Sequence, residues 1–254
     1  MRTASRTVEG LKPMDDTFFH KLVERKEFCE ELLQVILHKR DLKVVEYVPQ
    51  RSLRNVKGRS VIVDVHCMDR ERRHYNVELQ KEDNDDHQRR VRYNGSNLDT
   101  FISEKGIKFK DLPELYIIYI SAFDIFRKGK TVYHVDRTLR ETGDVVDNGF
   151  HEIYVNTEVD DHTDIADLMK LFQDSSIPED NRFPEICNSI RYYKEGKGRD
   201  DMCAIVEEYA KEYAKDMKTE SAKKMIQKGY SAEDIHEILN LSYEEIKELK
   251  RETV

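Results

Sequence analysis

Two neighbouring segments, each with an acidic residue among apolar neighbours, constrain this chain more than any other feature. Residues 60–68 (SVIVDVHCM) are nearly continuous in β-branched residues, and residues 73–80 (RHYNVELQ) follow after the charged turn 69–72. Two strands joined by a short polar turn form a hairpin. A carboxylate among apolar neighbours is costly unless it is paired or bound to a cation. The pattern therefore predicts that Asp64 and Glu78 lie close together near one edge of a sheet.

The segments around this hairpin predict an α/β fold. Asp15-Asp16 offers an N-cap for one amphipathic helix through residues 17–37. The other expected elements are a strand at 43–48 closed by Pro49, a helix at about 85–104, a buried strand at 115–120, strands at 131–135 and 151–155, and only helices from 164 onward. This order predicts a mixed central sheet flanked by helices, followed by an all-helical C-terminal region.

The same pattern divides the chain into four parts. We expect a disordered tail over 1–13, the α/β domain over 14–160, a helical extension packed on it over 161–198, and a helical appendage over 199–254. The appendage has helix-turn-helix spacing. Its last helix carries Glu244, Glu245, Glu248 and Glu252 against Lys247, Lys250 and Arg251. Because phosphates would repel that helix, self-association or regulation is the favoured role.

Composition limits the setting in which the protein works. No apolar run approaches the roughly 18–20 residues of a membrane span, and the N-terminus lacks the apolar core of a secretory signal. The four cysteines are scattered without metal-ligand spacing, which favours a reducing cytoplasm.

The charge is unevenly distributed along the chain. Its net charge of −8 argues weakly against a nucleic-acid-binding protein. Residues 51–93 hold eleven Lys/Arg against eight acids, whereas residues 141–180 hold twelve acids against one Lys. The chain therefore has a mildly basic half and a strongly acidic one, which could equally be two solvated faces.

Two converging carboxylates favour a hard divalent cation. Oxygen ligands suit Mg²⁺ or Mn²⁺, and such an ion supports hydrolysis of a phosphodiester. Gln80 lies on the strand face of Glu78 and could orient a water or a phosphate oxygen. The alternative is a hairpin with acids at its solvated rim.

An ordered set of motifs carries a family resemblance. The run Asp64-x13-Glu78-Leu79-Gln80 resembles the PD-(D/E)XK nuclease signature, with Gln in place of the final Lys. The surroundings resemble the recombination-promoting nuclease and transposase branch of that superfamily over roughly residues 14–160. The matching segments are DDTFFHK (15–21), NVELQ (76–80), RVRY (90–93, with Asn94 where a second Tyr is common) and GIKFKDLP (106–113) before the strand at 115–120.

The resemblance implies a restriction-endonuclease-like core and a Mg²⁺-dependent DNA endonuclease linked to recombination or mobile elements, with Mn²⁺ as an alternative ion. Asp64 and Glu78 would be metal ligands, with the Leu79 carbonyl as a third. Gln80 would occupy the position of the superfamily's Lys, which leaves activation of the nucleophile open. Many members add an acid from the first helix, here Glu31 or Glu24, although either could be a plain surface residue.

The remaining expectations concern partners. Arg89, Arg90 and Arg92 follow the active strand and could bind DNA phosphates, or they could form a solvated helix face. A homodimer is expected because two symmetric sites cut two strands most simply. Two other functions stay open: a catalytically silent DNA-binding or regulatory module, and an interaction scaffold organised by the C-terminal half.

Overall fold

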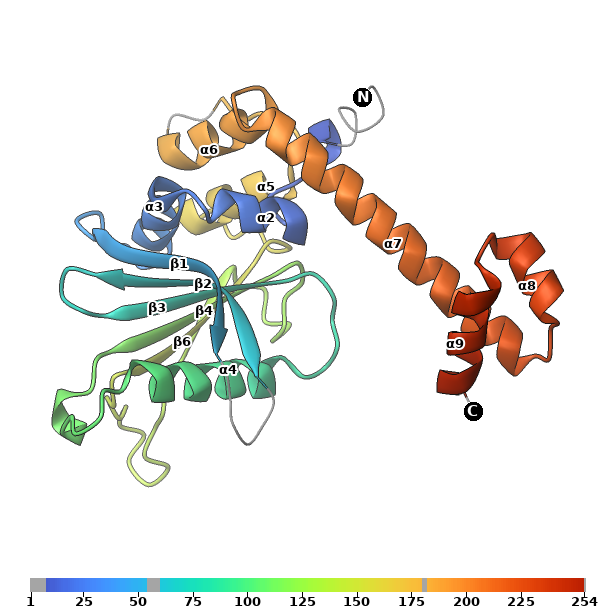
Figure 1. Ribbon diagram of the computed structural model, residues 1–254. Coiled ribbons are helices and arrows are strands. Elements are labelled where there is room, and N and C mark those ends of the chain that lie inside the picture. Colours follow the sequence, from blue (N-terminus) through green and yellow to red (C-terminus); the bar gives the residue numbers. More distant parts are fainter. Residues whose placement is uncertain (1–7, 54–59, 180–181, 254) are drawn as a thin grey trace. The chain divides into compact units, whose positions relative to one another are not determined.

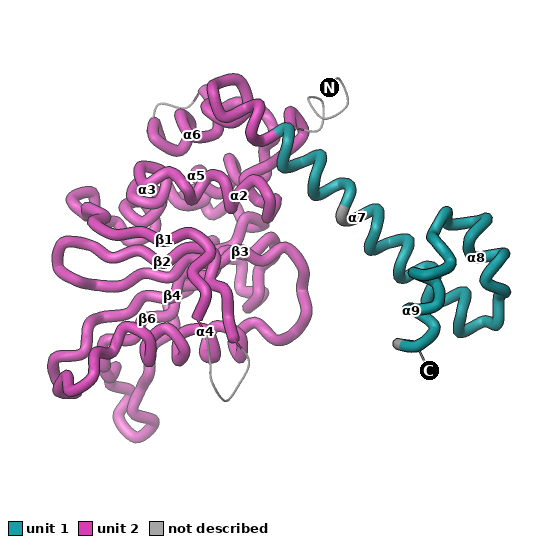
Figure 2. Tube along the Cα trace, viewed as in Figure 1, with its two compact units in different colours: residues 1–5, 203–254 teal, residues 6–202 magenta. Residues whose placement is uncertain are grey.

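The computed structural model describes residues 8–53, 60–179 and 182–253. Arg54, Lys57 and Arg59 of the basic segment therefore lie outside the described residues, as do the first seven residues of the expected tail. Residues 8–10 are helical and Val8 is buried. The chain forms two compact units, residues 6–202 and residues 1–5 with 203–254 (Figure 2).

A mixed six-stranded sheet forms the centre of the larger unit (Figure 1). In spatial order the strands are β1 (Val44–Leu53), β2 (Val61–Asp69), β3 (His74–Gln80), β4 (Leu115–Ser121), β6 (Phe150–Asn156) and β5 (Val132–Val135). The β1–β2, β2–β3 and β5–β6 pairs are antiparallel, and the β3–β4 and β4–β6 pairs are parallel. The hairpin and the mixed sheet expected from the sequence are confirmed.

Helices cover both faces of this sheet. The helix α4 (His87–Ile102) lies on one face (Figure 1). The other face is covered by α2 (Asp16–Leu22), α3 (Lys26–Ile36) and α5 (Asp164–Gln173), and α6 (Pro184–Lys194) packs on α3. A short 3₁₀ helix, η1 (Phe109–Asp111), precedes β4. The architecture is the restriction-endonuclease-like core with flanking helices that the sequence predicts.

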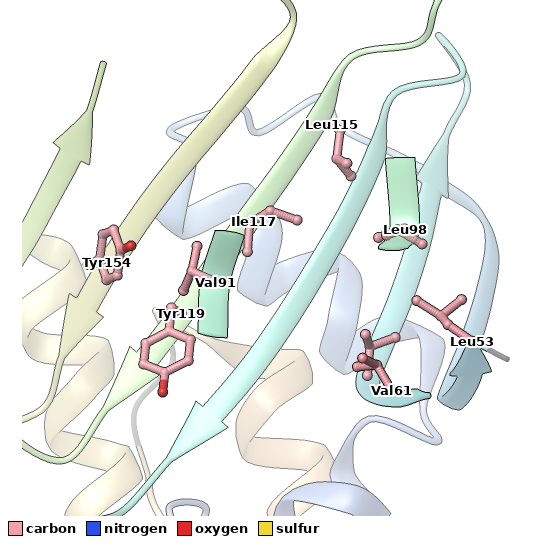
Figure 3. Packing of buried hydrophobic residues seen from close by; sticks show 9 residues of the cluster. Leu53, Val61, Val91, Leu98, Leu115, Ile117, Tyr119 and Tyr154 are labelled. Atoms are coloured by element: carbon pink, nitrogen blue, oxygen red, sulfur yellow. The ribbon is translucent and has the colours of Figure 1, made fainter. Parts of the chain in front are cut away.

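The helix α4 is held against the sheet by a hydrophobic cluster. Its Val91 and Leu98 pack with residues of β1, β2, β4 and β6, among them Ile117 (Figure 3). Gly95 permits the close approach, because a Cβ at this position would lie 2.6 Å from the ring of Phe150. This packing fixes the height of α4 above β3 and so positions the side chains that α4 directs toward Glu78.

Two details of the expected elements are wrong. The single helix at 17–37 is two helices, α2 and α3, separated at Val23–Arg25. Arg25 has extended backbone angles (φ −98°, ψ 116°), and its guanidinium donates to Ser189 Oγ. Tertiary contacts with α6 therefore override helix propensity at this point. Strand β1 also continues through Pro49. Proline has no backbone N–H to donate, and an edge strand tolerates it because the side of the strand that faces solvent has no neighbouring strand to pair with.

The helical extension belongs to the larger unit. Phe172 of α5 packs against Phe19 of α2, and Tyr193 of α6 packs against Phe18. The buried ammonium of Lys194 donates to three backbone carbonyls, those of Glu9, Leu11 and Ser175. These contacts fasten the segment before α2 to α5 and α6, and thereby hold α2 in place.

The smaller unit is helical. It contains most of α7 (Arg199–Gln227), with α8 (Ala232–Leu239) and α9 (Tyr243–Thr253). Its small core consists of Ala222, Ile235, Leu241 and Ile246. Ser231 begins α8 with a capping box, and Asn240 ends it in the left-handed region at φ 52°. In the described part of the chain no helix is long and apolar enough to cross a membrane.

Candidate active site

Asp64 and Glu78 lie where the β2–β3 ladder of the first hairpin ends. Strands β2 and β3 remain paired as far as Val65 opposite Val77. Asp64 and Glu78 are the next residues in that register. On its other side β3 stays paired with β4 along its whole length, from His74 to Gln80. Both residues therefore lie just beyond the last paired residues of β2 and β3.

The Asp64 carboxylate is held by two groups. Its Oδ2 accepts a hydrogen bond from the backbone N–H of Leu79 at 2.7 Å, and its Oδ1 lies 3.3 Å from His20 Nε2. The hydrogen bond to Asp64 raises the pKa of His20 above its ordinary value. Asp64 is thus oriented by β3 and α2 together, with 20% of its side chain exposed.

The Glu78 carboxylate is more deeply buried. Only 7% of the residue is exposed. Asn76 Nδ2 donates to Glu78 Oε1 at 2.8 Å, and Asn94 of α4 also donates to this carboxylate. Burial, followed by the nearby charge of Asp64, raises the pKa of Glu78 to about 8 despite these hydrogen bonds. The pair therefore carries an electrostatic strain that a bound cation would relieve.

Both carboxylates line one cavity of about 570 Å³ between the end of the hairpin and α4. The residues that line it are Ser60, Val61, Ile62, Asp64, Glu78, Leu79, Asp86, Arg89, Arg90, Tyr93 and Asn94. Those from α4 and its N-cap recur three or four positions apart, so they form one side of the helix. This side brings two guanidinium groups, the Asn94 amide and a third carboxylate, that of Asp86, to the cavity.

Gln80 does not line this cavity. Its Nε2 donates to the Glu82 carbonyl at 2.7 Å, and its Oε1 accepts from Arg90 Nη1 at 2.5 Å. Lys81, the next residue, donates to Asp15 Oδ1 at 2.6 Å. The amide of Gln80 is thus committed to Arg90 and to the backbone, rather than pointing at Asp64.

The comparison with known families fits this geometry. The model of the PD-(D/E)XK nuclease family transposase matches residues 13–164, more than half of the chain. The chain belongs to this family. Neither a curated protein nor a solved structure matches it. The matched region begins just before α2 and ends at the start of α5, so it contains the whole sheet and the cavity.

The structure does not bring the predicted additional acid to the cavity. Glu31 Oε2 accepts from the backbone N–H of Ile186 at 2.7 Å and thereby caps α6, while Glu24 pairs with Lys21 at 2.6 Å. Neither lines the cavity of this PD-(D/E)XK domain. On the N-terminal helices, Asp16 interacts electrostatically with Asp64. Burial, followed by the charge of Asp64, raises the pKa of Asp16.

The three predicted arginines divide into two groups. Arg89 and Arg90 line the cavity, and Arg92 does not. Arg89 and Arg92 are exposed, whereas Arg90 is half-buried. The basic side of α4 therefore contributes two cations to the nuclease-family cavity, and Arg92 is not one of them.

Sequence reasoning missed His20, Asp16 and Asn94 as members of the site. Asp16 and His20 are four residues apart, so a helix beginning at Asp16 places both on one side. This spacing is a usable signal, although both residues enter the sequence analysis only as part of a helix start and of the motif at 15–21. Asn94 follows Arg90 by four residues, and the same spacing could have assigned it to the arginine side of α4.

The donor set fits a divalent cation. Asp64 and Glu78 offer carboxylate oxygens, and the Leu79 carbonyl shares the side of β3 that its N–H presents to Asp64. Among the described residues, no group of three or more His, Cys, Asp or Glu side chains is arranged to hold a metal ion. The site therefore suits an ion such as Mg²⁺, which commonly takes one or two carboxylates and completes its shell with water and phosphate oxygens.

Proposed function

We propose that this family member is a metal-dependent DNA endonuclease linked to recombination or mobile elements. The observation that carries the proposal is the convergence of Asp64 and Glu78 on a cavity that Arg89 and Arg90 also line. Carboxylates suit a divalent cation, and guanidinium groups suit the oxygens of a phosphate. Together they match a phosphodiester that is held beside a bound Mg²⁺ or Mn²⁺.

The chain's own residues set up hydrolysis. Asp64 and Glu78, with the Leu79 carbonyl, would hold the ion. When bound, it would polarise the scissile phosphodiester and lower the pKa of a water nucleophile. Asn76 and Asn94 fix the orientation of Glu78, and His20 fixes that of Asp64.

Arginines of α4 support the choice of a nucleic-acid substrate. Arg89 lines the cavity and is exposed, and Arg92 is exposed on the same helix. Contacts of this kind would position the DNA backbone without reading its sequence. Cleavage of both strands would be simplest in a homodimer with two symmetric sites.

One observation favours the second candidate, a catalytically silent DNA-binding or regulatory module. Gln80 stands where the superfamily's Lys is expected, and its amide is bonded to Glu82 and Arg90. In that case the cavity would hold a phosphate without cutting it. Binding without cleavage separates this candidate from the endonuclease.

The test is nicking of supercoiled plasmid by the purified full chain with Mg²⁺ or Mn²⁺. Asp64→Asn and Glu78→Gln remove one negative charge each with little change in shape, and Glu27→Gln on the exposed side of α3 is the matched control. DNA binding is measured in parallel with Ca²⁺. The endonuclease predicts metal-dependent nicking that only the two site variants lose. Wild-type binding without nicking under either metal would establish the silent module instead.

A further inference from the structure

Among the described residues, those that line the cavity include three acids, Asp64, Glu78 and Asp86, and no lysine. Among the described residues that line it, the cations are Arg89 and Arg90. Lys81 is adjacent in sequence to Gln80, yet its ammonium is bonded to Asp15. A phosphodiester in this cavity would therefore meet its positive charge on α4 rather than on β3.

Arg90 is held from the side of β3. Its Nη1 donates to Gln80 Oε1 at 2.5 Å. The other end of the Gln80 amide donates to the Glu82 carbonyl at 2.7 Å. The Glu82 carbonyl can only accept, so the NH₂ group of Gln80 must face it. The oxygen of the Gln80 amide therefore faces α4. Gln80 therefore presents an acceptor to Arg90, which a lysine in its place could not do.

Arg90 is held from the side of β4 as well. Its guanidinium bonds to the Tyr119 hydroxyl. That hydroxyl lies 3.0 Å from Nδ1 of His87, and Nε2 of His87 lies 3.0 Å from Asp83. A guanidinium has five N–H donors, so these contacts leave others to face the cavity. Arg89, by contrast, is exposed.

The fixed guanidinium shares its cavity with the acidic pair. Arg90, Asp64 and Glu78 all line this cavity. A phosphate held beside Glu78 would therefore lie in the cavity that Arg90 lines.

We infer that Arg90 is a catalytic residue that supplies the fixed positive charge at the scissile phosphate, and that Gln80 is the positioning residue that holds it there. The inference rests on the proposed endonuclease function. Arg90 stabilises the negative charge that develops on a non-bridging oxygen during hydrolysis and transfers no proton. The positive charge that the superfamily's Lys would carry on β3 is then supplied by Arg90 of α4. Gln80, at the position of that Lys, holds the Arg90 guanidinium in place.

The experiment measures single-turnover cleavage of plasmid by the full chain with Mn²⁺ at increasing protein concentration. It separates the rate constant at saturation from the concentration that gives half-saturation. The variants are Arg90→Gln, Arg90→Lys and the double change Gln80→Lys with Arg90→Gln. The control is Arg72→Gln, which removes the same charge from the exposed turn between β2 and β3.

We expect Arg90→Gln to lower the saturating rate constant about 100-fold, the usual effect of removing one preorganised charge donor. Arg90→Lys should retain an intermediate rate, and the Arg72→Gln control should match the wild type. The double variant should cleave at least about 10-fold faster than Arg90→Gln alone, because its lysine returns a charge from β3. A purely structural role for Arg90 would give no such rescue.

Two results would overturn the inference alone. One is an Arg90→Gln protein that reaches the wild-type rate at saturation and loses only affinity. The other is a slow Arg90→Gln protein with an unchanged melting temperature that Gln80→Lys does not accelerate. A wild type that cuts with neither Mg²⁺ nor Mn²⁺ would instead remove the proposed function and this inference with it.

Discussion

Glu78→Gln should stabilise the metal-free protein at neutral and alkaline pH. The glutamate is 7% exposed, and burial with the Asp64 charge raises its pKa from 4.5 to about 8. A carboxyl whose folded-state pKa is raised stabilises the fold while it is protonated. That contribution is complete below pH 4.5 and is lost as the pH rises through about 8. A glutamine keeps the neutral hydrogen-bonding group at every pH.

The size of the effect follows from the pKa difference. Raising the pKa from 4.5 to about 8, at about 1.4 kcal/mol per unit, corresponds to an upper bound of about 5 kcal/mol. Local relaxation and entry of water reduce this bound, so a difference of about 2–3 kcal/mol between pH 5 and pH 8 is expected. The pKa of His20 is also raised, so the loss of its proton lowers the unfolding free energy of both proteins equally as the pH rises.

Urea unfolding in EDTA, followed by circular dichroism at pH 5, 6, 7 and 8, measures the difference directly. The unfolding free energy of the wild type should fall across this range relative to that of Glu78→Gln. Added Mg²⁺ should restore wild-type stability most at pH 8 and should not affect the variant. Parallel pH profiles for the two proteins would refute the account of a strained carboxylate pair.

Three further substitutions test the scaffold by urea unfolding, against the wild type. Lys194→Met leaves three backbone carbonyls without their donor and should cost about 3 kcal/mol. Gly95→Ala forces a Cβ to within 2.6 Å of Phe150 and should cost about 2 kcal/mol. Asp69→Asn weakens the buried bond to Arg73 Nε and should cost about 2 kcal/mol above pH 4, with the difference vanishing in acid because the pKa of Asp69 is lowered. Unchanged stability in any of the three would contradict the role given to that residue.

The sequence predicted the sheet and the acidic pair because both depend on local patterns. The apolar, β-branched run around Asp64 favours a buried strand. The short turn after it favours pairing with the next strand in antiparallel orientation. The register then follows from the turn, so that Asp64 and Glu78 must meet. The family motifs added the order of the remaining elements, and the family match confirms the core.

Long-range contacts account for what the sequence did not reveal. The break between α2 and α3 depends on the contact of Arg25 with Ser189, which is 164 residues away. Glu31 looked like a candidate ligand because it lies on the first helices, but α6 folds back and takes its carboxylate as a cap. The bond between Gln80 and Arg90 depends on the height of α4 above β3, which only the packed core determines.

The central claim is that Asp64 and Glu78 form the metal-dependent cutting site of this family member. The most direct test compares the nicking rate of wild type and Asp64→Asn across a titration of Mn²⁺, at equal DNA occupancy. The account predicts nicking by the wild type that rises to saturation with Mn²⁺ and is at least about 100-fold slower in the variant. Equal nicking by the two proteins, or nicking that persists in EDTA, would contradict it.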